Sequence, residues 1–293
     1  MFVIMGATGH VGSATARALL EAGEHVTIVT RHAGGGVELR KLGAEIAVAD
    51  VEDVATLRAA FQRGRRALLL NPPGDVTKDS DAIERRGVAN ILAALVGSGL
   101  EKVVAESTAG AQPGDRIGDL SVLWELEQGL LAQPIPAAIN RAAYYMSNWN
   151  MQLESAYETG TLTTMFPADL KVPMIAPADL GEFAAERLLS SHADVGIRMV
   201  EGPARYSSRE VADAFASALD RQVSLKTTPA GHWKDSFLEL GFSEEAADSY
   251  GRMTQVTVEI GFDAPGEALR GRITLQSYVD GLAKTLIDRH ADE

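Results

Sequence analysis

Three glycines near the start of the chain have the spacing of a phosphate-binding turn. Gly6, Gly9 and Gly12 lie in the stretch 6–12, Gly-Ala-Thr-Gly-His-Val-Gly, which directly follows the apolar residues 2–5. In such a turn the first glycine permits a tight bend, and the second lets the backbone approach a pyrophosphate. The third allows a helix to pack closely on the strand, and the amides of that helix hold the phosphate charge. The spacing in this position predicts a dinucleotide site.

We expect this loop to contact the cofactor through both its backbone amides and its short side chains. The residues predicted to make these contacts are Gly6, Thr8, Gly9, His10, Val11 and Gly12. His10 lies inside the phosphate loop, so it is expected to touch cofactor or solvent rather than to perform catalysis. The alternative is a glycine-rich turn that holds no ligand.

The residue after the second apolar run bears on the choice between NAD(H) and NADP(H). A carboxylate that holds the adenosine ribose usually ends this strand. This chain has Thr30, Arg31 and His32 there instead. A guanidinium group matches the geometry of a phosphate, so Arg31 favours the 2′-phosphate of NADP(H) over NAD(H). An Arg31 that is merely exposed remains the alternative.

Two further turns are predicted to flank the cofactor, and their residues are Asp50, Val51, Asn71, Pro72 and Pro73. Asp50 would accept a hydrogen bond from the adenine amino group, and Val51 would supply an apolar face. Asp50 is equally suited to cap the helix expected over 54–61. The two prolines form a stiff turn without amide donors, which suits either a wall beside the cofactor or a plain end of the strand.

Short apolar runs alternate with helical patterns through the first half of the chain. The predicted strands are 2–5, 26–29, 45–49, 67–70, 102–105 and 135–139, and the helices between them are 11–21, 37–42, 54–61, 80–96 and 120–131. This alternation requires a parallel sheet with helices on both faces. We therefore predict an α/β fold, a Rossmann doubly wound parallel sheet, with ligands at the carboxyl ends of the strands.

The alternation loosens after about residue 150. Strands are expected at 162–166 and 198–200, and helices at 177–190, 208–219, within 230–262 and over 268–287. We predict an NAD(P)-binding Rossmann domain over 1–150. The remainder, 151–293, is predicted to hold the last strands of the sheet interleaved with a smaller, mainly helical lobe that binds substrate.

Composition excludes several classes of protein. The 293 residues are 46% hydrophobic and 23% charged, include no cysteine and carry a formal net charge of −13. Such a charge disfavours nucleic acid and anionic membranes as partners. No apolar run approaches the roughly 20 residues of a membrane span, and the start does not resemble a signal peptide. We expect a cytoplasmic protein, and the six histidines show no spacing typical of a metal site.

The usual proton-transfer residues of short-chain dehydrogenases are missing from this chain. Those enzymes carry a serine after the fifth strand and a Tyr-x-x-x-Lys pair on the next helix. Ser107 stands at the expected place, where it would contact the cofactor and take part in catalysis. Neither tyrosine nor lysine occurs between Lys102 and Asn140.

The chain resembles the NmrA-like family of atypical short-chain dehydrogenases. The stretches that carry this resemblance are 6–12, Arg31, 71–73, 107–111, 124–127, 140–148, 172–181, 202–203 and 208–212. The resemblance implies binding of NADP(H), and it implies one of two activities. Family members include NADPH-dependent quinone and azo reductases, and also redox-sensing regulators that bind the dinucleotide without turnover. Isoflavone-reductase relatives carry a catalytic lysine after the fifth strand, and this chain has none there.

Aromatic residues after the sixth strand are the candidates for substrate contact and proton donation. Tyr144 and Tyr145 would stack on a flat substrate or donate a proton, and Asn148 would hydrogen-bond a carbonyl oxygen. Trp233 would line an apolar pocket. Ordinary packing inside the protein is the alternative for each of them.

Two hypotheses of function follow. The first is an NADPH-dependent reductase of quinone-like or conjugated carbonyl compounds, with a small molecule as its partner. The second is a non-catalytic NADP(H) sensor that also binds a protein, and the missing Tyr/Lys pair favours it. A homodimer is a possible assembly. Epimerase or dehydratase chemistry would require the missing pair, so it is the least favoured.

Overall fold

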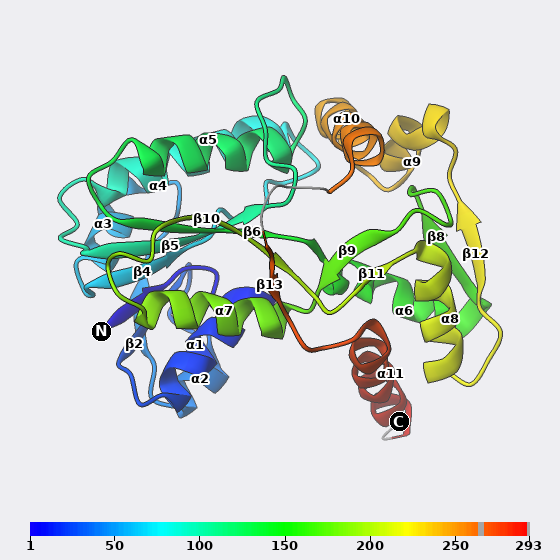
Figure 1. Cartoon of the computed structure of the whole chain (residues 1–293), viewed down its shortest axis with the longest axis horizontal. Helices are drawn as coiled ribbons and strands as arrows, with labels where there is room; N and C mark the ends of the chain where they lie inside the picture. The colour runs from blue at the N-terminus through cyan, green and yellow to red at the C-terminus, as the bar shows by residue number, and fades with distance from the viewer. Residues whose placement is uncertain (263–266, 292–293) are drawn as a thin grey trace.

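The main sheet of the computed structural model has eight strands, all of them parallel. The structure describes residues 1–262 and 267–291. The predicted second domain, 151–293, is therefore described without residues 263–266 and 292–293. The strand order is β13-β10-β6-β5-β4-β1-β2-β3 (Figure 1). The strands are β1 (Phe2–Ile4), β2 (Val26–Thr30), β3 (Glu45–Val48), β4 (Arg66–Leu69), β5 (Lys102–Thr108), β6 (Ala137–Ala142), β10 (Gly196–Glu201) and β13 (Leu269–Arg270). The predicted doubly wound Rossmann fold is confirmed.

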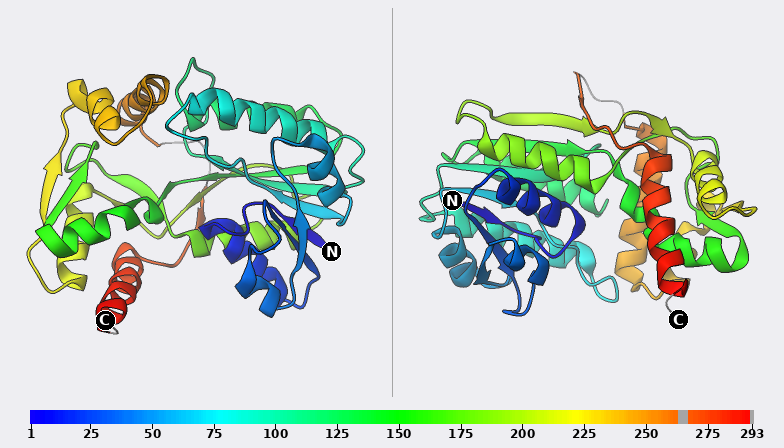
Figure 2. Two further views of the ribbon diagram at one scale, coloured as in Figure 1. Left: turned by 180° about the vertical axis from the view of Figure 1, so that it is seen from behind. Right: turned by 90° about the horizontal axis from the view of Figure 1, so that it is seen from below.

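Helices cover both faces of this sheet, as Figures 1 and 2 show. On one face lie α3 (Val54–Phe61), α4 (Ser80–Leu95) and α5 (Asp119–Leu131), and on the other α1 (His10–Glu21), α2 (Val37–Lys41) and α7 (Pro177–Leu189). Successive residues of a strand point to opposite faces. Val3 accordingly packs with α3, α4 and α5, whereas Phe2 and Ile4 pack with α1 and α7. Burial on both faces explains why the strands are apolar throughout.

A glycine brings α7 into close contact with α1. A Cβ atom placed on Gly181 would lie 2.5 Å from the Cβ of Ala14 and 2.8 Å from the amide nitrogen of Thr15. Helix α7 comes from the second half of the chain, so this contact attaches the later segments to the glycine loop.

The smaller C-terminal region packs beside the carboxyl edge of the sheet. Its elements are β7 (Tyr144–Tyr145), η1 (Met146–Gln152), α6 (Leu153–Thr159), β8 (Thr161–Thr164), β9 (Val172–Ile175), β11 (Arg205–Tyr206), α8 (Ser208–Ala218), β12 (Ser224–Thr227), η2 (Ala230–His232), α9 (Trp233–Glu239), α10 (Glu244–Ile260) and α11 (Leu275–Ala291). Strands β11, β9 and β7 form one small sheet, and β12 and β8 form another. Helix α10 lies above the carboxyl edge, close to the start of α5 (Figure 1).

The prediction of one helix over 268–287 is wrong at its start. Residues Leu269 and Arg270 pair with β10 as the edge strand β13, and the helix begins at Leu275. The carboxylate of Asp179 accepts hydrogen bonds from the amides of Arg272 and Ile273, each at 2.9 Å. These two amides are held by the Asp179 side chain of α7, in the segment between β13 and α11.

The described residues 1–262 and 267–291 contain no helix with the length and apolar character needed to cross a membrane.

Replacing Gly181 with alanine should destabilise the protein. The added methyl group cannot fit against Ala14 and Thr15 without moving α1 or α7, so we expect a loss of about 1–3 kcal/mol. Gly281→Ala is the matched control, since nothing lies within 4 Å of its Cβ position on α11. That change should stabilise the helix by up to about 1 kcal/mol. Denaturant unfolding measures both, and equal effects would contradict the close α1–α7 contact.

Candidate functional site: a dinucleotide-binding edge

The glycine loop has the geometry of a phosphate-binding turn. Gly6 has a φ of +64°, which favours glycine, and its carbonyl oxygen accepts a hydrogen bond from Gly9 N at 2.9 Å. A Cβ atom on Gly12 would lie only 2.4 Å from this carbonyl oxygen. The first turn of α1 therefore packs directly on the end of β1, and only glycine at position 12 permits this approach.

The start of α1 is open to a ligand. Its N-cap residue is Gly9, no side chain caps the helix, and its first turn carries no acidic residue. The first amides of a helix lack partners within it, so those of residues 10–12 are available to phosphate oxygens. Thr8, Gly9 and His10 are exposed, whereas Val11 is buried. Asp53 and Asp79 cap α3 and α4 at the same edge, so these two helix starts are already satisfied.

Arg31 lies at the end of the neighbouring strand β2. It is exposed, and it makes no hydrogen bond or ion pair with any residue that the structure describes. The hydroxyl of Thr30 donates to the carbonyl oxygen of His32 at 2.8 Å and shapes the turn. A free guanidinium group beside the glycine loop suits a ribose phosphate.

The structure decides the alternative role considered for Asp50. The cap of α3 is Asp53, whose carboxylate accepts from Ala55 N and Thr56 N. Asp50 instead accepts a hydrogen bond from Glu52 N at 3.0 Å and remains exposed. Its predicted contact with adenine is untested, and the neighbouring Val51 is partly buried against the core.

The turn after β4 is attached to α4 by one glutamate. Asn71 donates through Nδ2 to the carbonyl oxygen of Glu84 at 3.1 Å, and the Glu84 carboxylate accepts from Gly74 N at 2.8 Å. Pro72 is half-buried and Pro73 is exposed. These two hydrogen bonds with Glu84 fix the turn at the carboxyl edge of the sheet.

Ser107 lies at the carboxyl end of β5, but its hydroxyl is already engaged. It donates to Glu127 Oε1 at 2.6 Å. Arg141 donates to the same carboxylate through Nε at 2.8 Å and Nη2 at 2.6 Å. Glu127 is 0% exposed, so this is a buried ion pair between α5 and β6 with Ser107 as a third member. The hydroxyl proton of Ser107 is therefore held in a buried hydrogen bond to Glu127.

The two tyrosines of β7 face different surroundings. Tyr145 packs against a cluster of buried residues that includes Val11 of α1, and Leu70, which follows β4, packs against the same cluster. Tyr144 packs against the rings of Trp149 and Phe166, at centroid distances of 6.3 Å and 5.4 Å. Tyr145 thus lies at the cofactor edge, while Tyr144 belongs to the core of the smaller region.

The environment of Tyr144 includes the predicted substrate residue Asn148. Burial raises the pKa of Tyr144 to about 12, and a hydrogen bond with Asn148 works in the opposite direction. Trp233, also predicted to contact substrate, is 7% exposed, and its Nε1 donates to the carbonyl oxygen of Thr228 at 3.1 Å. Among the described residues, Trp233 makes no hydrogen bond or ring contact with Tyr145, and its indole nitrogen is engaged within the smaller region.

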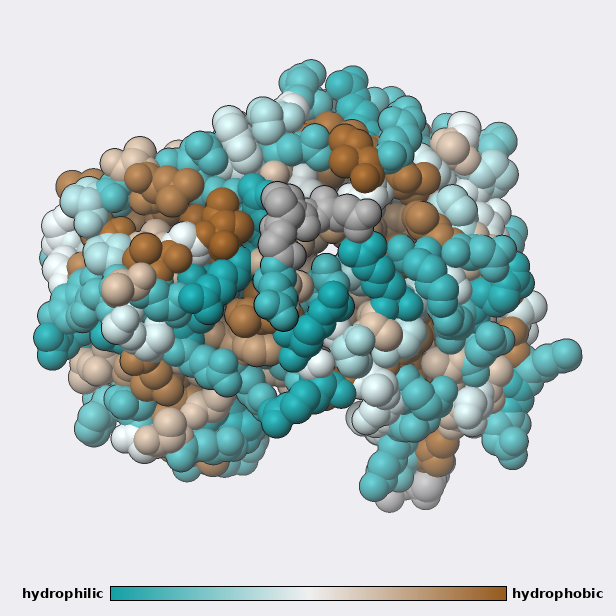
Figure 3. Space-filling view, in the orientation of Figure 1, coloured by the Kyte–Doolittle hydropathy of each residue, from teal (hydrophilic) through white to brown (hydrophobic). Residues whose placement is uncertain are grey.

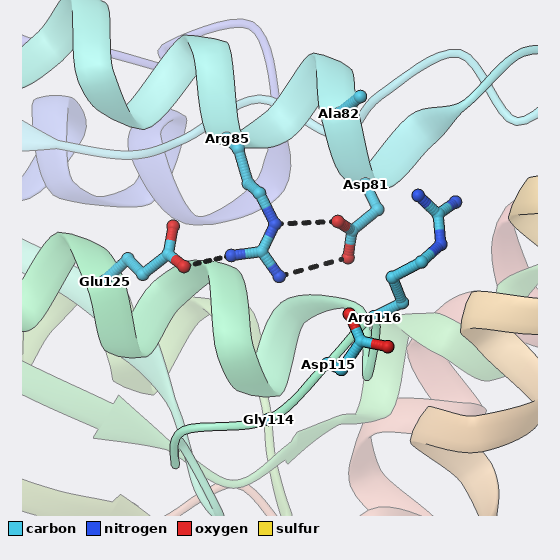
Figure 4. A pocket seen from close by; sticks show the side chains of 7 residues that line it. All are labelled: Asp81, Ala82, Arg85, Gly114, Asp115, Arg116 and Glu125. Atoms are coloured by element: carbon cyan, nitrogen blue, oxygen red, sulfur yellow. Dashed lines mark hydrogen bonds and ion pairs between the residues drawn. The ribbon is translucent and has the colours of Figure 1, made fainter.

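A pocket of about 530 Å³ lies beside α4 and α5 (Figure 4) and is lined by Asp81, Ala82, Arg85, Gly114, Asp115, Arg116 and Glu125. Arg85 pairs with Asp81 at 2.7 Å and also with Glu125. Arg116 pairs with Asp79 at 2.9 Å. Since both guanidinium groups are neutralised by protein carboxylates, this pocket lacks the free cations of a phosphate site. Within the described ranges, no cluster of His, Asp and Glu could hold a metal ion.

Sequence patterns missed two residues that lie at the carboxyl edge. Asp119 is the first residue of α5, and Tyr250 lies on α10. Gly118, next to Asp119, donates through its amide to Ser249 Oγ at 3.2 Å, which joins the two segments. No periodicity links positions this far apart in the chain. The positive φ values of 51° at Arg116 and 54° at Gly118 mark an unusual turn before α5.

The fold and this edge define an NmrA-like protein. The family profile matches residues 1–279, and the chain belongs to the NmrA-like family. Among curated proteins, the NAD(P)H azoreductase of Xenophilus azovorans is 25% identical over 249 residues, which is 85% of this chain and 84% of that protein.

Two solved structures share the fold at lower identity. The NADPH-dependent quinone oxidoreductase of Escherichia coli, in complex with NADPH, has a TM-score of 0.79 and 19% identity, covering 96% of this chain and 99% of that one. The triphenylmethane reductase of Citrobacter sp., in complex with NADP(H), has a TM-score of 0.77 and 18% identity, covering 96% and 100%. Both structures hold their dinucleotide in a fold that this chain shares.

Gly9→Ala should separate cofactor binding from folding. The new methyl group would meet only the Gly6 carbonyl oxygen, at 3.4 Å, so we expect stability to change by less than about 1 kcal/mol. The same methyl group would stand where the pyrophosphate approaches, and the affinity for NADPH should fall at least about tenfold, or 1.4 kcal/mol. Titration calorimetry and thermal unfolding check the two effects. Unchanged affinity would show that the phosphates do not approach Gly9.

Proposed function

We propose that this protein is an NADPH-dependent reductase that transfers hydride to quinone-like or other conjugated acceptors. Its membership of the NmrA-like family and its similarity to an NAD(P)H azoreductase support reductase chemistry. The acceptor itself is inferred from the chemistry of the site. A quinone accepts hydride readily, so positioning it over the nicotinamide supplies much of the rate.

One observation carries this proposal. Tyr145 packs against the buried cluster that includes Val11, and its hydroxyl has no hydrogen-bond partner among the described residues. A dinucleotide bound at the open start of α1 extends along the carboxyl ends of the strands toward this tyrosine. The site therefore offers a half-buried aromatic ring with a free hydroxyl at the reactive end of the cofactor.

NADP(H) is the proposed cofactor because of the residue at the end of β2. The glycine loop and Arg31 would hold the pyrophosphate and the 2′-phosphate, respectively. Asp50 and Val51 would lie beside the adenine, and Asn71, Pro72 and Pro73 beside the nicotinamide ribose. The cofactor supplies a hydride, while these residues bind and orient it.

A redox sensor that binds NADP(H) without turnover is the second candidate. The observation that favours it is the engagement of Ser107 by Glu127, together with the missing Tyr/Lys pair. A sensor would require a protein partner, whereas the reductase requires only a small molecule. Action in the cytoplasm, without nucleic acid or membrane partners, forms part of both proposals, and a homodimer is compatible with each.

Turnover distinguishes these candidates. We expect the purified protein to oxidise NADPH in a saturable manner when a small quinone is present, and to oxidise NADH less efficiently. Absorbance at the reduced nicotinamide band measures both rates. Tight NADPH binding without oxidation by quinones or azo compounds would contradict the reductase and favour the sensor.

Arg31→Ala should weaken NADPH binding much more than NADH binding. Loss of a charge-assisted contact to phosphate costs about 1.5–3 kcal/mol, so we expect the Kd for NADPH to rise by about 10- to 100-fold. Arg221→Ala is the control, because Arg221 is an exposed arginine between α8 and β12, away from β2 (Figure 1). Equal losses for NADPH and NADH would contradict the 2′-phosphate contact.

A further inference from the structure

Asp119 lies where α10 crosses the start of α5. The amide of Gly118 donates to Ser249 Oγ at 3.2 Å, and a Cβ atom on Gly118 would lie 2.9 Å from the Sδ atom of Met253. Helix α10 is therefore in direct contact with the residue that precedes Asp119. This contact joins the smaller region to the carboxyl edge of the main sheet.

Three further side chains surround Asp119. Its charge acts on Tyr145 of β7, on Tyr250 of α10 and on Glu84 of α4. The surrounding protein desolvates Asp119 and raises its pKa, yet the residue is exposed to solvent. A side chain that is both desolvated and exposed lines a hollow rather than a convex surface. Figure 3 shows the surface hollowed between the sheet and the smaller region. We call the space beside Asp119 and the two tyrosines on which its charge acts, Tyr145 and Tyr250, the acceptor hollow.

The polar groups of the acceptor hollow are unpartnered. Neither the Asp119 carboxylate nor the hydroxyls of Tyr145 and Tyr250 make a hydrogen bond or ion pair with a residue in the described parts of the chain. Three nearby aspartates are paired with arginines: Asp79 with Arg116 at 2.9 Å, Asp81 with Arg85 at 2.7 Å, and Asp115 with Arg252 at 3.5 Å. Asp119 differs from them in facing an open space without a cation.

Glu106 adds a second unpartnered group below the hollow. It is 3% exposed, its Oε1 accepts from Asn140 at 3.0 Å, and its Oε2 has no partner. Burial raises the pKa of Tyr145, and the charges of Glu106 and Asp119 raise it further. Burial raises the pKa of Glu106 to about 8 and that of Glu84 to about 7.

The proposed reaction requires a proton at this place. Hydride transfer to a neutral acceptor leaves negative charge on an oxygen or nitrogen atom of that acceptor. Among the described residues, no lysine, arginine or histidine is found among the charges that act on the three residues of the acceptor hollow. The usual Tyr/Lys pair is missing as well.

We propose that Asp119 is the proton donor to the hydride acceptor. This inference rests on the proposed reductase function. The C–H bond of the reduced nicotinamide breaks and its two electrons and hydrogen pass to the acceptor, which leaves the oxidised cofactor. The O–H bond of the Asp119 carboxyl breaks, an O–H or N–H bond forms on the acceptor, and the carboxylate regains a proton from water.

Asp119 suits this role better than its acidic neighbours. A proton donor has to reach both the acceptor and a source of new protons. Glu84 and Glu106 are 4% and 3% exposed, and each already accepts a hydrogen bond through one oxygen. Asp119 is exposed to solvent and faces the same tyrosines.

The proposal has a definite pH dependence. Desolvation raises the pKa of Asp119, against the positive end of the α5 dipole, which favours the charged form. The groups that face it are Glu84 on α4, Tyr145 on β7 and Tyr250 on α10. The protonated acid is the active form. The rate should therefore fall as the pH rises through this raised pKa.

The test compares two acceptors in Asp119→Asn. A neutral benzoquinone needs a proton after hydride transfer, whereas a triphenylmethane dye cation becomes neutral on accepting hydride and needs none. We expect kcat/KM with the quinone to fall about 10²- to 10³-fold and to lose its decline with pH. With the dye, kcat/KM should stay within about threefold if general acid catalysis is the only function removed.

Asp115→Asn is the matched control, since Asp115 is an exposed aspartate four positions before Asp119 in the same loop region. It should leave both rates unchanged. Asp119→Glu keeps the carboxyl group and should retain part of the quinone activity and its pH dependence. NADPH affinity and the melting temperature of each variant show whether the site is intact.

Two results would overturn the proposal while leaving the reductase function standing. One is an unchanged quinone rate in Asp119→Asn, and the other is an equal loss with both acceptors, which would indicate a structural or binding role. A natural protein that reduces neither acceptor would contradict the reductase function itself, and the proton donor with it.

Discussion

The close approach of Gly12 to the Gly6 carbonyl oxygen is the contact on which the site depends. A side chain at position 12 would begin 2.4 Å from that oxygen, so only glycine lets α1 start where β1 ends. The open amides of α1 then face the carboxyl edge of the sheet. Arg31 follows β2 at this edge, and the turn at Asn71 follows β4. A second contact of this kind, between Gly181 and Ala14, fixes α7 against the same helix. The cofactor edge is therefore defined by backbone contacts more than by functional side chains.

A buried ion pair and a buried hydrogen bond between arginine and asparagine join β6 to the helices on the two faces of the sheet. Glu127 and Arg141 join α5 to β6 on one face, while Arg187 donates to Asn140 Oδ1 at 3.0 Å on the other. Breaking such a pair by removing one partner costs about 3–5 kcal/mol, because the remaining charge stays buried. Ser107 belongs to the first of these networks. Ser107 therefore has a structural partner in this fold, whereas the Tyr/Lys pair expected beside it is absent from the sequence.

The sequence predicted the sheet well, because apolar runs and glycines act over short distances. The helix over 54–61 and the start of the helix at 80 agree with the structure, and the other early boundaries agree or differ by at most three residues. The helix predicted from 268 failed because Asp179, about ninety positions earlier, binds the amides of Arg272 and Ile273. The two-residue strand β7 is too short to show periodicity, so the opposite surroundings of Tyr144 and Tyr145 could not be predicted.

The same limit explains what could be predicted of the site. The phosphate turn is a continuous stretch, and the residues that shape it lie within seven positions. The acceptor hollow joins Asp119 to Tyr250 through a packing contact between α5 and α10, and no local pattern records that contact. The sequence could not decide between Asp50 and Asp53 as the cap of α3, because the spacing allows either aspartate. The backbone turn in the structure makes Asp53 the cap.

The division of the site between two parts of the chain has a chemical consequence. The cofactor edge is built by the first strands and helices, whereas the hollow is completed by α10, which is attached at the turn after β4. Ser243, the cap of α10, donates through its amide to the Val76 carbonyl oxygen at 2.9 Å and through its hydroxyl to that of Lys78 at 2.8 Å. Substitutions on α10 can therefore reshape the space for the acceptor without moving the phosphate turn. Such an arrangement allows one mode of dinucleotide binding to serve acceptors of different shape and charge, because the charge around the acceptor depends on the residues that α5 and α10 place there.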